Sequence, residues 1–259
     1  MGRGESGTGT LGKAMEVLET IALSSTPLRF TDVLHRVDQP RGTLHRQISN
    51  LIEEGLLSTR ADNSYELGLT LLKFASRAWS SNQFRTIAEP HLKHLHDITG
   101  ETVHLGVLNG VDVIYLDKVE SRQAVRMYSQ IGNSAPAFCT GVGKAAMAAL
   151  PDAELQSRIS SIAFKRYTDT TLVTTTALST EIQDIRQSGN AFDREEHEKD
   201  IHCVAAPIHS DDRNFVAGIS VTAPIYRVNM DQLIEWGPLV RESAAAIMDD
   251  MANRLGPKA

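Results

Sequence analysis

The sequence has few cysteines, no long apolar run and no excess of positive charge. Its two cysteines, Cys139 and Cys203, are far apart and lack C-x-x-C spacing, so they predict neither a disulfide framework nor a zinc site. No apolar run approaches the roughly 20 residues that a membrane helix requires, and no secretory signal is recognisable. The formal net charge of −6 argues against a general nucleic-acid coat but allows a local DNA-reading element.

The remaining composition is typical of a globular protein. Of the 259 residues, 41% are hydrophobic and 22% are charged, which suffices for one large or two ordinary domains. The first nine residues are rich in Gly, Ser and Thr and predict a disordered leader. The two unpaired cysteines suit a reducing compartment, so we predict a cytoplasmic protein without a membrane segment.

Residues 28–72 carry the pattern on which the functional interpretation depends. Apolar residues recur at helical spacing from Leu28 to Val37, with Thr31 as the expected N-cap. Pro40 suits the first turn of a second helix, because its missing N–H would have no partner there. The expected buried face of that helix is Leu44, Ile48, Leu51 and Ile52. Residues 56–59 and 65–67 flank a polar turn and predict a β-hairpin. Two helices followed by such a hairpin predict a winged helix-turn-helix over this stretch.

The start of the second helix supplies the physical case for DNA. Its free N–H groups and dipole favour a phosphate oxygen. Arg41 and Arg46 can neutralise phosphates or pair with guanine, while Thr43, His45 and Gln47 are expected to reach base edges or backbone. The predicted DNA-contacting residues are Arg36, Arg41, Gly42, Thr43, His45, Arg46 and Arg60. The alternative is a small helical domain with a solvated polar face, since residues 1–75 hold eight Lys/Arg against nine Asp/Glu.

The rest of the chain predicts an α+β arrangement. Helices are expected at residues 69–79, 83–99, 144–150, 153–159, 180–188 and 231–255. Strands are expected at 102–108, 111–118, 124–128, 201–208 and 214–222, the first two joined by a type I′ turn at Asn109-Gly110. An antiparallel sheet flanked by helices fits this order. The predicted boundaries are 1–9 for the leader, 10–70 for the winged domain, 71–83 for a linker helix and 84–259 for the second domain.

A glycine-rich segment, Cys139–Lys144, precedes one of these helices. Bare N–H groups at a helix start suit a small anion such as a carboxylate. A nucleotide-binding Walker A loop does not fit, because Phe138 stands where glycine is needed and Ala145 where Ser or Thr is needed.

Long runs of the chain resemble one family, the isocitrate-lyase-regulator (IclR) family of bacterial transcription factors. Its DNA-binding half is similar to QPRGTLHRQISNLIEEGLL followed by YELGLTLLKFA, although Gly42 stands where a serine is usual. Its second half is similar to ETVHLGVLNGVDVIYLDKVES, VRMYSQIGNSAPAFCTGVGKAAMA, AFDREEHEKDIHCVAAPI and AGISVTAP. The resemblance implies a GAF/profilin-like effector-binding domain over residues 84–259. It also implies that the first helix helps pair two DNA-binding domains in a homodimer. A homotetramer is the alternative, since Trp79 and Phe84 near the linker could form a second interface.

The resemblance also implies an effector cavity formed by several segments. Gly141 and Val142 match a loop that lies against the effector, and Asp193 matches an acidic residue that can bind an effector hydroxyl. Further matching positions lining the cavity are Cys203, Ser220 and Thr222, and Met127 is expected in its apolar wall. The alternative for the strand residues is plain core packing on inward-facing positions.

These features predict a ligand-responsive transcriptional regulator that represses a catabolic operon, with a double-stranded DNA operator as partner and no cofactor or metal. The anion-friendly loop and Asp193 suggest a small carboxylate effector, and VRMYSQIG resembles regulators of sugar-acid catabolism. The alternative is a small-molecule-binding enzyme with a helical accessory domain. His91, His94 and His96 could suggest metal ligands, but helical spacing points His96 away from the other two. Glu195-Glu196 with His197 could suggest acid–base chemistry, but no recognisable catalytic motif accompanies them.

Overall fold

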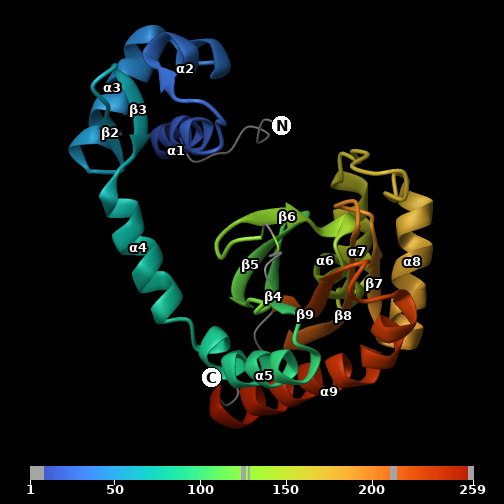
Figure 1. The fold of residues 1–259 in the computed structure, drawn as a ribbon. Coiled ribbons are helices and arrows are strands. Elements are labelled where there is room, and N and C mark those ends of the chain that lie inside the picture. The colour runs from blue at the N-terminus through green and yellow to red at the C-terminus, as the bar shows by residue number, and fades with distance from the viewer. Residues whose placement is uncertain (1–8, 124–126, 128, 211–214, 256–259) are drawn as a thin grey trace. The chain divides into compact units, whose positions relative to one another are not determined.

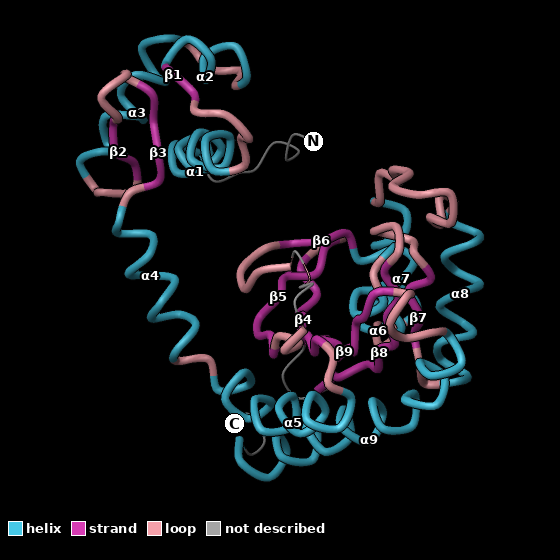
Figure 2. The backbone as a smooth tube through the Cα atoms, viewed as in Figure 1, coloured by secondary structure: helices cyan, strands magenta, loops and turns pink. Residues whose placement is uncertain are grey.

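The computed structural model describes residues 9–123, 127, 129–210 and 215–255 (Figures 1 and 2). The chain divides into two compact units, Met1–Ser81 and Asn82–Ala259. The predicted leader lies outside the described residues except for Gly9, which begins the first helix. None of the helices among the described residues is long and apolar enough to cross a membrane.

The first unit is a helical core with a small sheet. Its elements are α1 (Gly9–Ala22), β1 (Leu28–Arg29), α2 (Phe30–Arg36), α3 (Arg41–Glu53), β2 (Leu57–Thr59), β3 (Ser64–Leu67) and α4 (Leu69–Ser80). Strand β3 pairs antiparallel with both β1 and β2. The core contains Leu18 of α1, Val33 of α2 and Leu44 and Ile48 of α3, so the predicted spacing of apolar residues places three helices around one interior. The predicted winged helix-turn-helix is confirmed.

Two local expectations in this unit are wrong. Thr31 is not the N-cap of α2, because the chain is still extended at Arg29 and becomes helical at Phe30. The Asp32 carboxylate reaches back and accepts the Arg29 N–H at 2.8 Å, which satisfies one of the free donors at the helix start. In α3, Ile52 was expected on the buried face but is 37% exposed, whereas Leu44, Ile48 and Leu51 are buried. Leu11 of α1 is 70% exposed, so part of the apolar stripe of that helix is not covered within the unit.

The second unit has a six-stranded antiparallel sheet in the order β6-β5-β4-β9-β8-β7. Its strands are β4 (Thr102–Asn109), β5 (Asp112–Val119), β6 (Ser134–Pro136), β7 (Ala191–Arg194), β8 (Ile201–Ser210) and β9 (Phe215–Pro224). Its helices are α5 (Gln83–Thr99), the 3₁₀ turn η1 (Ala137–Cys139), α6 (Gly141–Ala148), α7 (Asp152–Ser161), α8 (Thr175–Ser188) and α9 (Met230–Leu255). The predicted α+β class, an antiparallel sheet flanked by helices, is confirmed.

Helices cover both faces of this sheet. Helices α5 and α9 pack side by side against one face, and α6 lies on the other with α8 beside it (Figure 1). The alternation of strand residues separates two cores. Val204 and Ala206 of β8 face α5 and α9, whereas Cys203 and Ala205 face the α6 side.

Several boundaries differ from the sequence prediction. The β4–β5 turn is Gly110-Val111 between the paired Asn109 and Asp112, and only Gly110 has a positive φ, as in a type II′ turn. The strand expected at 124–128 falls mostly outside the described residues, and Met127 is not in a strand. The short strands β6 and β7 were not predicted, since three or four residues carry too little periodicity. Helix α6 begins at Gly141, three residues before the expected start.

Candidate functional sites

A cavity opens on the α6 side of the sheet in the second unit. All seven residues expected around an effector line it: Met127, Gly141, Val142, Asp193, Cys203, Ser220 and Thr222. Seven further lining residues were not predicted: His104, Tyr115, Ser129, Thr140, His197, Glu198 and Ile201. The cavity volume is about 50 Å³.

Strand register brings the polar cavity residues together. Asp193 of β7 pairs with Cys203 of β8, and Cys203 pairs with Thr222 of β9, so the three form one row across the sheet. Ser220 lies two residues before Thr222 and therefore faces the same side, with His104 of β4 opposite it. The core-packing alternative stays open for Cys203, which belongs to the buried cluster on the α6 side, while the neighbouring Ile219 and Val221 are buried under α5 and α9.

Helix α6 packs with its first turn directly on the sheet, and glycine makes this close approach possible. A Cβ at Gly141 would lie 2.5 Å from Cys203 Sγ, and one at Gly218 would lie 2.6 Å from the Val142 carbonyl oxygen. Thr140 precedes the helix, but its hydroxyl donates to the Pro136 carbonyl at 3.0 Å and does not cap α6. The first-turn amides of α6 and the positive end of its dipole therefore border the cavity without a side-chain cap.

Asp193 is the buried acid of the cavity. One of its carboxylate oxygens accepts the Glu196 N–H at 2.7 Å. Burial, and then the nearby Glu196 carboxylate, raises the pKa of Asp193 to about 7. Near neutral pH this group can therefore accept a hydrogen bond from a ligand or donate its own proton.

His104 gives the opposite side of the cavity a neutral donor and acceptor. Its Nε2 lies 2.6 Å from Ser129 Oγ, and its Nδ1 lies 3.2 Å from Thr222 Oγ1. Burial, and then the Lys118 ammonium, lowers the pKa of His104 to about 3, so the ring carries no charge at neutral pH. The sequence signal for His104 was its inward position on β4, one residue from the buried Val103 and Leu105.

The buried cysteines are poor candidates for covalent chemistry. Burial, and then Asp193, raises the pKa of the Cys203 thiol to about 12. Burial also raises the pKa of Cys139. Because the thiolate is the nucleophilic form, Cys203 contributes shape and a weak hydrogen-bonding group to the cavity wall.

The histidines that could have suggested an enzyme are dispersed. His91 Nε2 lies 3.0 Å from the Asp250 carboxylate, linking α5 to α9. His96 Nδ1 lies 2.8 Å from the Glu101 carbonyl at the end of α5. Within the described residues, no three His, Cys, Asp or Glu side chains gather as a metal-binding group.

In the first unit, the start of α3 presents an exposed basic surface. Arg41, His45 and Arg46 are exposed and Thr43 is half-buried, while Leu44 and Ile48 face the core. Arg41 lies over the Phe30 ring, with its guanidinium carbon 5.3 Å from the ring centre. Gly42 is exposed, and a Cβ there would meet nothing within 4 Å. These side chains are therefore free to approach a nucleic-acid backbone.

Three further residues were expected to contact DNA. The expectation for Gln47 is wrong, whereas Arg60 and Arg36 are exposed but hydrogen-bonded within the unit. Gln47 was expected to reach base edges but is 2% exposed and faces the core of the unit. Arg60 is exposed on the wing, where its Nε donates to the Glu66 carboxylate at 2.6 Å. Arg36 is exposed at the end of α2 and donates to Ser24 Oγ at 3.1 Å.

Comparison with known proteins assigns both units. The family described as "IclR helix-turn-helix domain" matches residues 10–61, and "Bacterial transcriptional regulator IclR C-terminal" matches residues 76–249. The chain belongs to the IclR family of bacterial transcriptional regulators. It is 31% identical to the HTH-type transcriptional regulator BhcR of Paracoccus denitrificans, over 96% of this chain and 89% of that protein. This IclR-family protein is thus a DNA-binding transcriptional regulator, and the enzyme alternative is wrong.

Two other relatives extend the likeness. The transcriptional repressor IclR of Escherichia coli is 29% identical, over 92% of this chain and 88% of that protein. The crystal structure of an IclR homologue from Microbacterium hydrocarbonoxydans, complexed with 4-hydroxybenzoate, has the same fold. It has a TM-score of 0.75 and 23% identity, and the match covers 95% of this chain and 100% of that chain.

Proposed function

We propose that this IclR-family protein is a repressor of a catabolic operon, released or engaged by a small hydroxylated carboxylate such as a sugar acid. The observation that carries this proposal is the composition of the cavity. An uncapped helix start borders one side, and Asp193, Ser220, Thr222 and His104 supply hydroxyl-recognising groups around the rest. The α6 amides suit a carboxylate, and the side-chain groups suit hydroxyls.

Among the described residues that line the cavity, the absence of a positively charged side chain favours this division of roles. His104 is neutral, and the cavity-lining residues among those described include no Lys or Arg. A ligand carboxylate would therefore be bound by backbone amides, and its hydroxyl would meet Asp193. The 4-hydroxybenzoate in the Microbacterium homologue also combines a carboxylate with a hydroxyl, which supports the same chemical class here.

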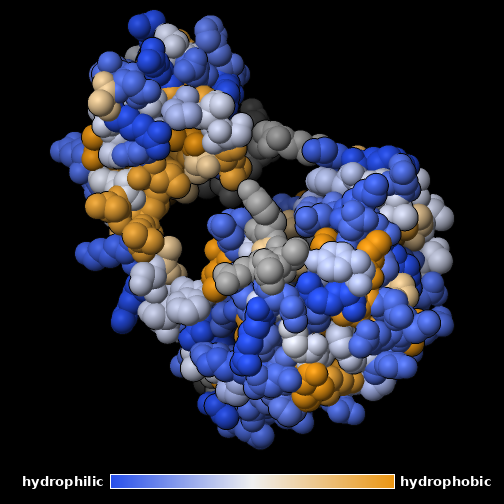
Figure 3. Space-filling view, viewed as in Figure 1, coloured by the Kyte–Doolittle hydropathy of each residue, from blue (hydrophilic) through white to orange (hydrophobic). Residues whose placement is uncertain are grey.

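The regulator is proposed to act as a homodimer or homotetramer on a near-palindromic operator. Apolar side chains gather over α4 in the space-filling view (Figure 3). Leu69 is 83% exposed, Leu72 68% and Phe74 58%, and Leu11 and Met15 of α1 are also exposed. Such contiguous apolar surface is typical of an interface between protein chains. Two α3 helices paired in this way would enter successive major grooves.

Ligand control requires that the effector binds one arrangement of the protein better than another. We therefore expect operator affinity to change when the cavity is occupied. The repressor assignment is supported by the E. coli relative, whose name states that it is a transcriptional repressor.

Isothermal titration of the full chain tests the ligand class. The panel is D-gluconate, D-galacturonate and 4-hydroxybenzoate, with D-glucose as a control that has hydroxyls but no carboxylate. We expect at least one acid to bind and glucose not to bind. Asp193→Ala should weaken the binding about tenfold or more, because a hydrogen bond to a charged group is lost. Asp184→Ala, on the exposed side of α8, is the matched control. No binding by any acid would refute the proposed class.

A further inference from the structure

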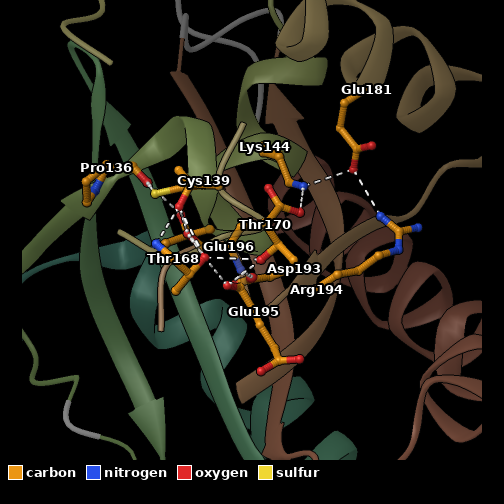
Figure 4. Close-up of polar contacts among 12 residues, drawn as sticks. Pro136, Cys139, Lys144, Thr168, Thr170, Glu181, Asp193, Arg194, Glu195 and Glu196 are labelled. Carbon is orange, nitrogen blue, oxygen red and sulfur yellow. Dashed lines mark hydrogen bonds and ion pairs between the residues drawn. The ribbon is translucent and has the colours of Figure 1, made fainter. Parts of the chain in front are cut away.

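A buried lysine joins α6 to the two segments beside it. Lys144 is 0% exposed, and its Nζ lies 2.9 Å from Glu181 Oε1 of α8 and 2.5 Å from Glu196 Oε1 (Figure 4). Glu196 follows β7 and is itself buried. A buried ammonium group that is shielded from solvent needs such carboxylate partners, because an uncompensated buried charge is strongly unfavourable.

The segment that carries Glu196 is held in a constrained conformation. Glu195 has a φ of 61°, a left-handed conformation that is uncommon for residues other than glycine. Its carbonyl accepts the hydroxyls of Thr168 at 2.6 Å and Thr170 at 2.7 Å (Figure 4). The Glu196 carbonyl accepts the Thr171 hydroxyl at 2.7 Å. Strained backbone of this kind persists only where surrounding contacts fix it, and it concentrates at functional sites.

Glu196 acts on two sides of the cavity at once. Its backbone N–H donates to the Asp193 carboxylate, which fixes the acid that faces the ligand space. Its side chain holds Lys144, which lies on the helix whose first turn borders the cavity. His197 and Glu198, the next two residues, line the cavity themselves, whereas neither Lys144 nor Glu196 does. The two residues can therefore affect a ligand only through the groups that they hold.

We propose that Lys144 and Glu196 are positioning residues of the effector site, which set the first turn of α6 and the Asp193 carboxylate in one fixed relation. This inference rests on the proposed function, because it assumes that a ligand meets both groups. The Lys144–Glu196 ion pair and the Glu196 N–H together join helix α6 and residues 193–198 into one wall of the cavity. A ligand that bridges carboxylate and hydroxyl subsites is then selected by the spacing between them.

Glu181 provides a matched control within the same cluster. Removing the carboxylate of Glu196 leaves Lys144 paired with Glu181, and removing that of Glu181 leaves Lys144 paired with Glu196. Each change deletes one of two ion pairs to the same ammonium, and the Glu181 change also deletes the 3.5 Å ion pair with Arg194. We expect the Glu196 change to loosen the 195–198 segment directly, because Glu196 lies in that segment, whereas Glu181 reaches β7 only through the exposed Arg194. A purely structural cluster would respond to both changes alike.

The first test is hydrogen–deuterium exchange of the full chain without ligand, comparing wild type, Glu196→Ala and Glu181→Ala. We expect exchange in peptides covering residues 193–200 to rise about tenfold in Glu196→Ala and to stay near wild type in Glu181→Ala. Glu196→Gln, which retains an acceptor for Lys144, should restore most of the protection. Equal exchange in the two alanine variants would overturn the proposal. Should Glu196→Ala fail to fold, Glu196→Gln is compared with Glu181→Gln under the same criterion.

The second test is titration of the same variants with D-gluconate and 4-hydroxybenzoate. An acid that binds wild type should bind Glu196→Ala about tenfold more weakly and Glu181→Ala within about twofold of wild type. Equal losses in both variants would overturn the positioning role. If neither acid binds wild type, the proposed ligand class fails for these acids. The exchange measurement then decides the positioning role independently.

Discussion

Two helix starts, those of α3 and α6, offer the same backbone chemistry to different partners. Both begin without a side-chain cap, so both present free N–H groups and the positive end of a dipole. The start of α3 is exposed and is surrounded by Arg41, His45 and Arg46. The start of α6 is buried against the sheet and faces Asp193. The residues around each helix start, rather than the helix start itself, therefore indicate its ligand. They indicate a DNA phosphate at α3 and a small carboxylate at α6.

The largest effect is expected at the start of α6, where the buried Asp193 should make the stability of the protein depend on pH. Its pKa is raised to about 7 in the folded protein, so the folded state binds more protons than the unfolded state between about pH 4 and 7. Its contribution to the free energy of unfolding should therefore fall as pH rises through that range, by up to about 4 kcal/mol, and stay constant above it.

The variant that isolates this contribution is Asp193→Asn. Subtracting its unfolding free energy from that of wild type, in denaturant titrations from pH 4 to 8, removes the opposite trend expected from His104. We expect the difference to become less favourable to wild type as pH rises. A difference that is independent of pH would contradict the assigned environment of Asp193.

The second prediction concerns how closely each helix start approaches its neighbours. Gly141→Ala should destabilise the protein by about 1–3 kcal/mol, because the added Cβ meets Cys203 Sγ at 2.5 Å. Gly42→Ala, at the open start of α3, should be neutral or stabilising by up to about 1 kcal/mol. Thermal unfolding followed by circular dichroism measures both.

A double variant tests the stated cause. Gly141→Ala with Cys203→Ala removes the sulfur that the new Cβ meets, so the two changes should cost less together than the sum of their separate effects. Simple additivity would show that the loss comes from elsewhere in the α6 turn.

The third prediction separates the basic residues of the first unit. Arg46→Ala should weaken binding to all DNA sequences about tenfold and lower the salt dependence of log affinity by about one. Arg60→Ala should have a smaller effect, because the Arg60 side chain is engaged by Glu66 on the wing. Fluorescence anisotropy at several salt concentrations provides both slopes. An unchanged slope in Arg46→Ala would remove Arg46 from the phosphate contacts.

The smallest effect is expected at Gly42, where the family usually has serine. The site has room for a side chain, since a Cβ there meets nothing within 4 Å. Gly42→Ser should tighten operator binding by up to about fivefold, through one added hydroxyl contact and a better helix former. Weaker binding in the same anisotropy assay would mean that the bare backbone at Gly42 is itself required.

The sequence predicted most of the elements and half of the residues that line the cavity, for identifiable reasons. The family resemblance implied Ser220 and Thr222 as cavity residues, and strand alternation explains why both face the same side. Gln47 was misassigned although it lies three residues after Leu44 and four before Leu51, a spacing that puts it on the buried face. The Lys144–Glu196 pair was not predicted, because its partners are 52 residues apart and no local pattern encodes that contact. His104 was missed because a single polar residue on a buried strand gives no distinctive motif.

We infer that ligand binding in the cavity beside α6 changes DNA binding at the α3 surface. Fluorescence anisotropy of the full chain on its own upstream DNA, with and without an acid that binds in calorimetry, tests it directly. We expect salt-sensitive, sequence-selective binding whose affinity changes about tenfold with the acid in wild type and does not change in Asp193→Ala. Sequence-selective binding that the bound acid leaves unchanged would contradict the coupling. An equal response in Asp193→Ala would contradict the assigned site.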